Sequence, residues 1–171
     1  REELAVPKTF RDYNRVASFF TRGCNAASPT QYGSTVAIGN VVVSPSEFMP
    51  RLFAENGRLL DSQGRITLDT PEALRALENY RETYSYSDRT IYDFWKNALE
   101  GFADGTAAMT VVFINYASHI LNSQMSRIAG KLGFAPVPGG KPLLGGGVIG
   151  IAQSCTCPAA ACKFLEWLYA D

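Results

Sequence analysis

The pattern of apolar and polar residues is clearest in the middle of the chain, over residues 93–116, DFWKNALEGFADGTAAMTVVFINY. Apolar residues recur at spacings of three and four across 94–102, which predicts a helix with one buried face. Asp93 can cap the start of this helix. Gly105 predicts its end, because glycine readily takes the left-handed backbone found at many helix C-termini.

Two short apolar runs predict buried strands that are followed by polar side chains. The run 109–113 leads to Asn115 and Tyr116, and the run 36–38 leads to Asn40. Ligands of open α/β sheets bind where strands end, so these three residues are candidate ligand-binding residues. The Tyr116 ring can stack on a sugar ring or another flat ligand, and ordinary packing is the alternative.

Further helices are predicted near both ends of the chain and after residue 70. Thr9 and Asp12 form a variant of the capping box, ahead of a helix that ends near Gly23. Thr70 is placed as an N-cap before Pro71, and Pro158 opens the last helix. Residues 116–125 also have a helical pattern. The side chains expected to face the core are Leu74, Leu77, Tyr80 and Tyr84 in the helix after Thr70, and Phe164, Leu165 and Leu168 in the last helix.

The stretch 44–57, SPSEFMPRLFAENG, contains a proline that complicates its helical pattern. An interior proline costs a helix about 3 kcal/mol, so we expect the helix to begin at Pro50 and to end at Gly57. Ser44 and Ser46 would then lie in an irregular approach to it. The remaining predicted elements are a hairpin over 58–68 and strands over 132–138 and 148–152. Because helices and strands alternate, the predicted fold class is α/β.

Composition and charge narrow the possible partners. Lysine and arginine number 16, and so do aspartate and glutamate, so no excess charge points to nucleic acid or an anionic membrane. A chain of 171 residues is long enough for one domain with a core. The sequence starts at Arg1 and ends at Asp171, directly after an amphipathic helix, so we expect the chain to be part of a longer protein, with a start at a processing site as the alternative.

Two patterns with chemical potential have plainer alternatives. Residues 145–150, GGGVIG, match G-x-G-x-x-G, but they lie between a loop and a predicted strand, whereas dinucleotide binding needs a strand before and a helix after. Bare backbone at Gly145, Gly146 and Gly147 would instead let a ligand or a facing lobe approach closely, with a flexible loop as the alternative. His119 is the only histidine and matches no nucleophile motif, which favours a structural or surface role.

Four cysteines leave three alternatives open. Cys155, Cys157 and Cys162 have the spacing C-x-C-x4-C, and Cys24 lies far away in the sequence. This spacing lacks the paired C-x2-C units of a zinc ribbon. An oxidised pair in an exported protein and free thiols packed as small hydrophobes are the other two interpretations. No metal or cofactor is predicted.

The order of segments resembles the carboxy-terminal lobe of the extracellular solute-binding proteins of ABC importers, in particular the carbohydrate-binding group that includes maltose-binding protein. The segments that match are FMPRLFAENGRLLD, LDTPEALRALENY, ALEGFADGTAAMTV, KLGFAPVPGG and GGGVIGIAQSCTCPAAACKFLEWLYAD. The resemblance implies a periplasmic-binding-protein-like fold of type II, with a central mixed sheet flanked by helices. It makes residues 1–171 a single lobe, with the other lobe absent.

The resemblance also implies what the protein does. A two-lobed receptor would close around a solute, without catalysis, and deliver it to a membrane permease. This chain has Asn115 and Tyr116 where the family commonly places a tryptophan, and residues 46–49 replace an aromatic of maltose-binding relatives. Uncharged polar residues and a tyrosine ring suit a carbohydrate. The candidate ligand-binding residues are Asn40, Ser44, Ser46, Asn115, Tyr116, Gly145, Gly146 and Gly147.

The implied location is extracellular or periplasmic, with an anchor that a preceding segment would supply. Disulfides persist outside the cytoplasm, so the resemblance favours an oxidised pair that joins Cys162 to Cys155 or Cys157. Two other classes of function stay open at this point. One is a small α/β enzyme of the thiol hydrolase type that uses a cysteine with His119, and the other is a non-catalytic interaction domain.

Overall fold

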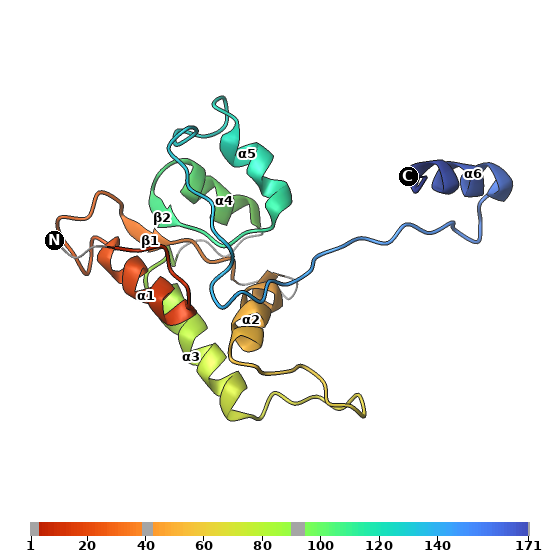
Figure 1. The fold of residues 1–171 in the computed structure, drawn as a ribbon. Coiled ribbons are helices and arrows are strands. Elements are labelled where there is room, and N and C mark those ends of the chain that lie inside the picture. The colour runs from red at the N-terminus through yellow and green to blue at the C-terminus, as the bar shows by residue number, and fades with distance from the viewer. Residues whose placement is uncertain (1–3, 39–42, 90–94, 171) are drawn as a thin grey trace.

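The computed structural model describes residues 4–38, 43–89 and 95–170 of the chain (Figure 1). Its elements, in chain order, are α1 (Phe10–Phe19), β1 (Tyr32–Ser34), α2 (Val43–Ala54), α3 (Pro71–Ser85), α4 (Trp95–Ala103), β2 (Ala107–Met109), the 3-10 helix η1 (Ile114–Tyr116), α5 (Ala117–Leu121) and α6 (Pro158–Leu168). Among these helices, none has the length and apolar character needed to cross a membrane.

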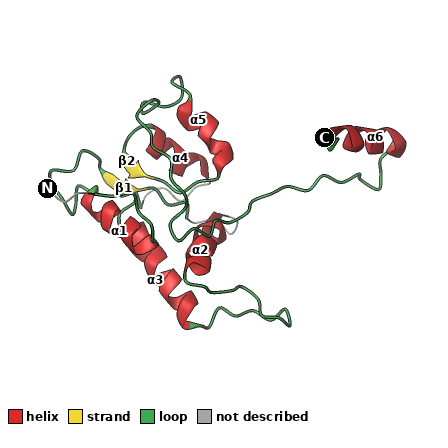
Figure 2. Cartoon of the chain, viewed as in Figure 1, coloured by secondary structure: helices red, strands yellow, loops and turns green. Residues whose placement is uncertain are grey.

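The centre of the molecule is a parallel pair of strands. Tyr32 of β1 lies opposite Ala107 of β2, and Ser34 lies opposite Met109. Figure 2 shows the pair between α1 and α3 on one side and α4 and α5 on the other. Helices around a parallel pair confirm the α/β class. The sheet in the described residues is smaller than the central sheet that we expected.

Both strands are displaced from their predicted positions. β2 ends at Met109, so the run 110–113 is extended but outside the ladder, and β1 precedes the run 36–38. The amide of Thr35 still donates to the Met109 carbonyl at 3.0 Å, and the two segments separate after this hydrogen bond. The run 36–38 is mostly buried and the run 109–113 is half buried, both by packing rather than by strand pairing, and an apolar pattern alone does not distinguish the two.

The start of α1 agrees with its predicted capping box. The Thr9 hydroxyl accepts from the Asp12 amide at 3.1 Å, and the Asp12 carboxylate accepts from the Thr9 amide at 3.2 Å. A hydrogen bond from the Thr9 hydroxyl lowers the pKa of Asp12. The buried face of α1 then meets β1 so closely that a Cβ on Gly33 would lie 1.8 Å from the Ala17 carbonyl oxygen. Only glycine permits this approach.

α3 begins as predicted but turns a different face inward. Thr70 caps it by accepting from the Ala73 amide, and Pro71 takes the first helical position. The buried positions are Ala73, Ala76, Tyr80 and Thr83. Leu74 and Leu77 are 57% and 54% exposed, so the predicted apolar stripe is wrong there. Ala73 and Ala76 pack against Leu52 of α2, and their small side chains let the two helices approach closely.

α2 corrects the prediction of a helix that starts at Pro50. The helix begins at Val43 and continues through Pro50. The proline removes one backbone hydrogen bond. One turn of the helix around it is held instead by Arg51, whose guanidinium donates to both the backbone carbonyl and the carboxylate of Glu47. After the helix, Asn56 rather than Gly57 takes the left-handed backbone, with φ of 63°.

The central helix and the hairpin agree with the sequence in outline. α4 ends at Ala103, and Gly105 has the positive φ, 78°, that was expected of it. The predicted cap Asp93 lies outside the described residues. Leu60 and Ile66 form an antiparallel bridge, which confirms the small hairpin over 58–68.

The C-terminal part departs most from expectation. α5 ends at Leu121 rather than near residue 125, and neither 132–138 nor 148–152 forms a strand. Prolines at 136, 138 and 142 lack the N–H that a ladder needs, which disfavours strand pairing in the first of these segments. The chain then runs outward as an exposed arm over 144–157, and α6 stands away from the body (Figure 1).

α6 starts at Pro158 as predicted, but its apolar side chains do not face a core in this structure. Phe164 and Leu168 are exposed, which corrects the expectation that they face inward. Phe164 and Trp167 lie against each other, with ring centroids 5.8 Å apart. The apolar face of this helix therefore has its contacts within the helix itself.

The position of α3 can be tested with two leucine substitutions. Leu52→Ala removes a fully buried side chain and should lower the free energy of unfolding by about 2 to 5 kcal/mol. Leu77→Ala, the matched control on α3, should change it by no more than about 0.5 kcal/mol, because this side chain is half exposed. Urea unfolding measures both. A large loss for Leu77→Ala would mean that α3 packs with its predicted leucine stripe inward.

Candidate functional site

A small apolar cluster lies just beyond the ends of the two strands. Its buried members are Ala37, which follows β1, Val43 at the start of α2, and Ala98 of α4. Val112, Phe113 and Tyr116 are half buried and pack against these three. The segments after both strands therefore meet the first turn of α2 at one place, which we call the strand-end cluster.

One of the predicted site residues lies at this cluster, and two others are sequence neighbours of its members. Tyr116 packs on the cluster itself, and its neighbour Asn115 is exposed in η1. Ser44 follows Val43 and is half buried in the first turn of α2. Ser46 is half buried two residues further along, about half a helical turn from Ser44. Both serines lie in a regular helix, which corrects the prediction of an irregular approach segment.

The glycine loop reaches the same place through one contact. A Cβ on Gly145 would lie 2.8 Å from the Phe113 ring, so the bare backbone lies directly on this aromatic side chain. Gly146 and Gly147 are exposed, with open space where a Cβ would be. The structure thus brings Ser44, Tyr116 and Gly145 to the strand-end cluster and leaves Gly146 and Gly147 in solvent. Asn40 lies outside the described residues.

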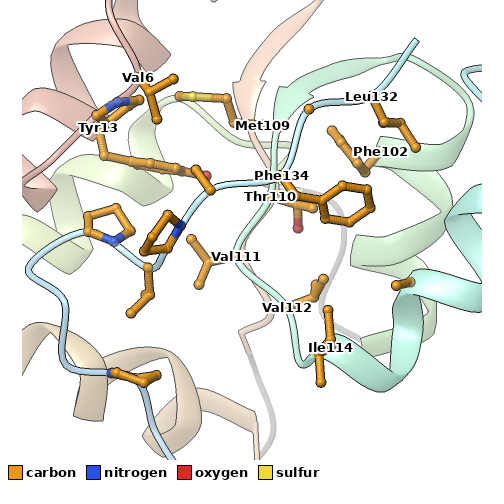
Figure 3. Close-up of a pocket in the computed structure, with 18 of the residues that line it drawn as sticks. Val6, Tyr13, Phe102, Met109, Thr110, Val111, Val112, Ile114, Leu132 and Phe134 are labelled. Carbon is orange, nitrogen blue, oxygen red and sulfur yellow. The ribbon is translucent and has the colours of Figure 1, made fainter. Parts of the chain in front are cut away.

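A pocket of about 550 Å³ opens beside the cluster, between residues 108–114 and 132–143. Figure 3 shows Val111, Val112 and Phe134 among the side chains that line it. Thr110 supplies a hydroxyl, which accepts from Thr35 at 2.7 Å. Because its lining is mainly apolar, this pocket offers little to a ligand rich in hydroxyl groups.

Sequence reasoning missed a buried charged pair below the cluster. Glu47 and Arg51 are 4% and 2% exposed, and Arg51 Nη1 donates to Glu47 Oε2 at 3.1 Å. Arg51 Nη2 donates to the Thr83 hydroxyl at 3.4 Å. The guanidinium carbon also lies 4.6 Å from the ring centroid of Phe10 and 5.1 Å from that of Tyr80. Glutamate and arginine four residues apart in an otherwise apolar helix were the available signal.

Burial dominates the electrostatics of this interior. It raises the pKa of Glu47, against the opposing effects of Arg51 and of the hydrogen bond from the Ala37 amide. It also raises the pKa of Tyr80 to about 12, while a hydrogen bond with the Ser44 side chain acts in the opposite direction. Tyr80 is therefore a neutral phenol at physiological pH, with a hydroxyl that can both donate and accept.

The cysteines and His119 are not among the residues of the strand-end cluster or of the buried pair. Cys24 is in the turn after α1, Cys155 and Cys157 are in the arm, and Cys162 is in α6. All four are free thiols, which contradicts the expected oxidised pair. His119 is half buried in α5. Within the described ranges, no three histidine, cysteine, aspartate or glutamate side chains are grouped as metal ligands would be.

Comparison with known proteins decides the family. The family model for bacterial extracellular solute-binding proteins matches residues 2–171, nearly the whole chain. The chain belongs to this family. A protein of Escherichia coli (strain K12) named "Putative ABC transporter periplasmic-binding protein YcjN" is 27% identical over 118 residues, which are 69% of this chain and 25% of that protein. This chain of the solute-binding family therefore spans about a quarter of the length of that relative.

Three solved structures share the fold. The solute-binding protein of an ABC transporter from Agrobacterium radiobacter K84, in complex with ribitol, has a TM-score of 0.76 at 24% identity, over 96% of this chain and 42% of its own. A second solute-binding protein, from Agrobacterium vitis S4 with bound D-mannitol, has a TM-score of 0.73 at 18% identity, over 96% of this chain and 40% of its own. Maltose-bound MalE3 of T. maritima has a TM-score of 0.65 at 22% identity, over 81% of this chain and 36% of its own. They confirm the periplasmic-binding-protein-like fold.

Proposed function

We propose that the protein containing this chain is the solute-binding component of an ABC importer and binds a sugar or a polyol. Three observations support this: the family match, the relative named for an ABC transporter, and the ribitol, mannitol and maltose in the structures of similar fold. The protein acts by binding rather than by catalysis. Its partner is a membrane permease, which recognises the receptor when it has closed around the solute outside the cytoplasm.

The observation that carries the proposal is the meeting of Ser44, Tyr116 and Gly145 at the strand-end cluster. A hydroxyl, an aromatic face and bare backbone come from three separate segments to one side of the body. These groups suit a neutral, hydroxyl-rich solute, because a tyrosine face covers C–H groups and a serine hydroxyl exchanges hydrogen bonds. Asn115 and Ser46 on the same segments add polar groups. Asn40, Gly146 and Gly147 complete the proposed site.

We further infer how the chain is divided between two lobes. The described residues up to 143 form the body, which we take to be one wall of the cleft, whereas the arm and α6 are exposed. Trp167 is 71% exposed, and a partner that covered this ring would remove its apolar surface from water. The similar structure with ribitol matches 96% of this chain and is more than twice its length. The remainder of the full-length protein would supply the second lobe and cover α6.

The lobe assignment predicts that one substitution has two different costs. In residues 1–171 alone, Trp167→Ala should change the free energy of unfolding by no more than about 0.5 kcal/mol, because the ring is largely exposed. In the full-length protein, where the second lobe covers the ring, it should cost about 3 to 5 kcal/mol. Urea unfolding of both proteins measures this, with Lys163→Ala on the same helix as control. A small loss in both would contradict the assignment.

The proposed site predicts losses of solute affinity. In the full-length protein, Tyr116→Ala and Asn115→Ala should each weaken binding by about 1 to 3 kcal/mol, as expected for a lost stacking ring or a lost hydrogen-bond partner. Calorimetric titration with ribitol, D-mannitol and maltose provides the measurement. Gln124→Ala, an exposed amide after α5, is the control. If both site variants bind as tightly as the unchanged protein, the site lies elsewhere. Binding of peptides or metal ions alone would refute the sugar and polyol class.

A further inference from the structure

Ala37 is held on both sides by side chains from helices. Its amide donates to Glu47 Oε1 of α2 at 3.0 Å, and its carbonyl accepts from the Tyr80 hydroxyl of α3 at 3.2 Å. Ala37 is fully buried and lies beyond the strand ladder, where these backbone groups would otherwise need partners. Two side chains therefore replace the neighbouring strand at this point, and we call them the Ala37 clamp.

The clamp is connected directly to a proposed site residue. The Ser44 side chain acts on the same Tyr80 hydroxyl, whose pKa it lowers. Ala37 itself belongs to the cluster on which Tyr116 packs. One buried hydroxyl thus links the strand end, the first turn of α2 and the surface that carries Tyr116.

The buried charged pair orients the other half of the clamp. Arg51 binds Glu47 Oε2, which leaves Oε1 for the Ala37 amide. Arg51 is in turn held between the rings of Phe10 and Tyr80 and by the Thr83 hydroxyl. Thr83 donates to Asn14 Oδ1 at 2.6 Å, which extends the network to α1. Helices α1, α2 and α3 all fix the direction of one carboxylate.

We propose that Glu47 and Tyr80 are positioning residues for solute binding. By clamping Ala37 they fix the strand end and the first turn of α2, and with them Ser44 and the surface beneath Tyr116. This inference rests on the proposed function and adds to it, because neither side chain is part of the proposed ligand-contacting set. The affinity for a sugar or polyol should depend on the clamp even where the solute does not touch it.

The experiment uses the full-length protein and separates the clamp from the charge. Tyr80→Phe removes one clamp hydroxyl and keeps the ring. The double variant Glu47→Gln, Arg51→Met keeps an acceptor for the Ala37 amide without either charge. The double variant Glu47→Leu, Arg51→Met removes the acceptor as well. Tyr86→Phe is the matched control, since its hydroxyl bonds to Glu82 rather than to the clamp.

Solute affinity and Ala37 exchange are measured on every variant that melts cooperatively. We expect Tyr80→Phe and Glu47→Leu, Arg51→Met to bind ribitol, D-mannitol or maltose about 5- to 20-fold more weakly, in the range of a lost buried hydrogen bond. Glu47→Gln, Arg51→Met should bind at least about threefold more tightly than Glu47→Leu, Arg51→Met, because it keeps the acceptor for the Ala37 amide, and Tyr86→Phe should stay within about threefold of the unchanged protein. Amide exchange of Ala37, followed by NMR without solute, should accelerate at least about tenfold in Glu47→Leu, Arg51→Met only.

The outcomes distinguish the clamp from the proposed function. Folded Tyr80→Phe and Glu47→Leu, Arg51→Met proteins with unchanged affinity would overturn the positioning role. Equal loss in both double variants would also overturn it, because the charge and not the clamp would then matter. If the unchanged protein binds none of the three solutes while Ala37 exchange still responds, the proposed function fails and the clamp is structural only.

Discussion

The ion pair between Glu47 and Arg51 is the interaction on which the arrangement of the body depends. It lies where α1, α2 and α3 meet, and both partners are almost completely buried. Removing one partner of such a pair commonly costs about 3 to 5 kcal/mol, because the other charge stays buried and unpaired. Domains of this size are stable by only about 5 to 15 kcal/mol. The pair therefore contributes less as a source of net stability than as a constraint that permits one packing of the three helices.

Hydrogen bonds and packing contacts connect this ion pair to the surface of the proposed site. The carboxylate that binds Arg51 also accepts from the Ala37 amide, and Ala37 packs with Val43 in the strand-end cluster. The cluster supports Tyr116 and, through Phe113, the backbone of Gly145. A rigid interior beneath a neutral polar surface is suited to a solute whose hydroxyl groups need fixed partners, since an ordered site loses less conformational entropy when it binds.

Local signals in the sequence predicted the starts and ends of several helices well. Thr9, Thr70, Gly105 and Pro158 act through bonds or backbone angles within a few residues, so their roles can be inferred without tertiary structure. Pro50 was misjudged because its compensation comes from the Arg51 side chain. The face of α3 was also misjudged, since the close approach of α2 favours Ala73 and Ala76 over the larger leucines. Such preferences depend on contacts between distant segments.

The candidate site was predictable in part. Strand ends and turn residues pointed to Tyr116, Ser44 and Gly145. The spacing of Glu47 and Arg51 indicated a charged pair, and the helical pattern placed Tyr80 in the core, but neither pattern identified Ala37 as their hydrogen-bond partner. The C-terminal strand at 148–152 and the inward face of α6 were expected from their apolar patterns. In this structure both stand clear of the body, and an apolar pattern does not identify the surface that will cover it.

We propose that this chain forms one wall of a cleft that closes on a sugar or polyol at the strand-end cluster. Hydrogen exchange of the full-length protein, followed by mass spectrometry with and without a bound solute, can locate this wall. We expect slower exchange with solute in peptides that cover residues 43–46, 113–117 and 143–147, with no change in the hairpin over 58–68. Protection confined to other segments, with these three unchanged under saturating solute, would contradict it.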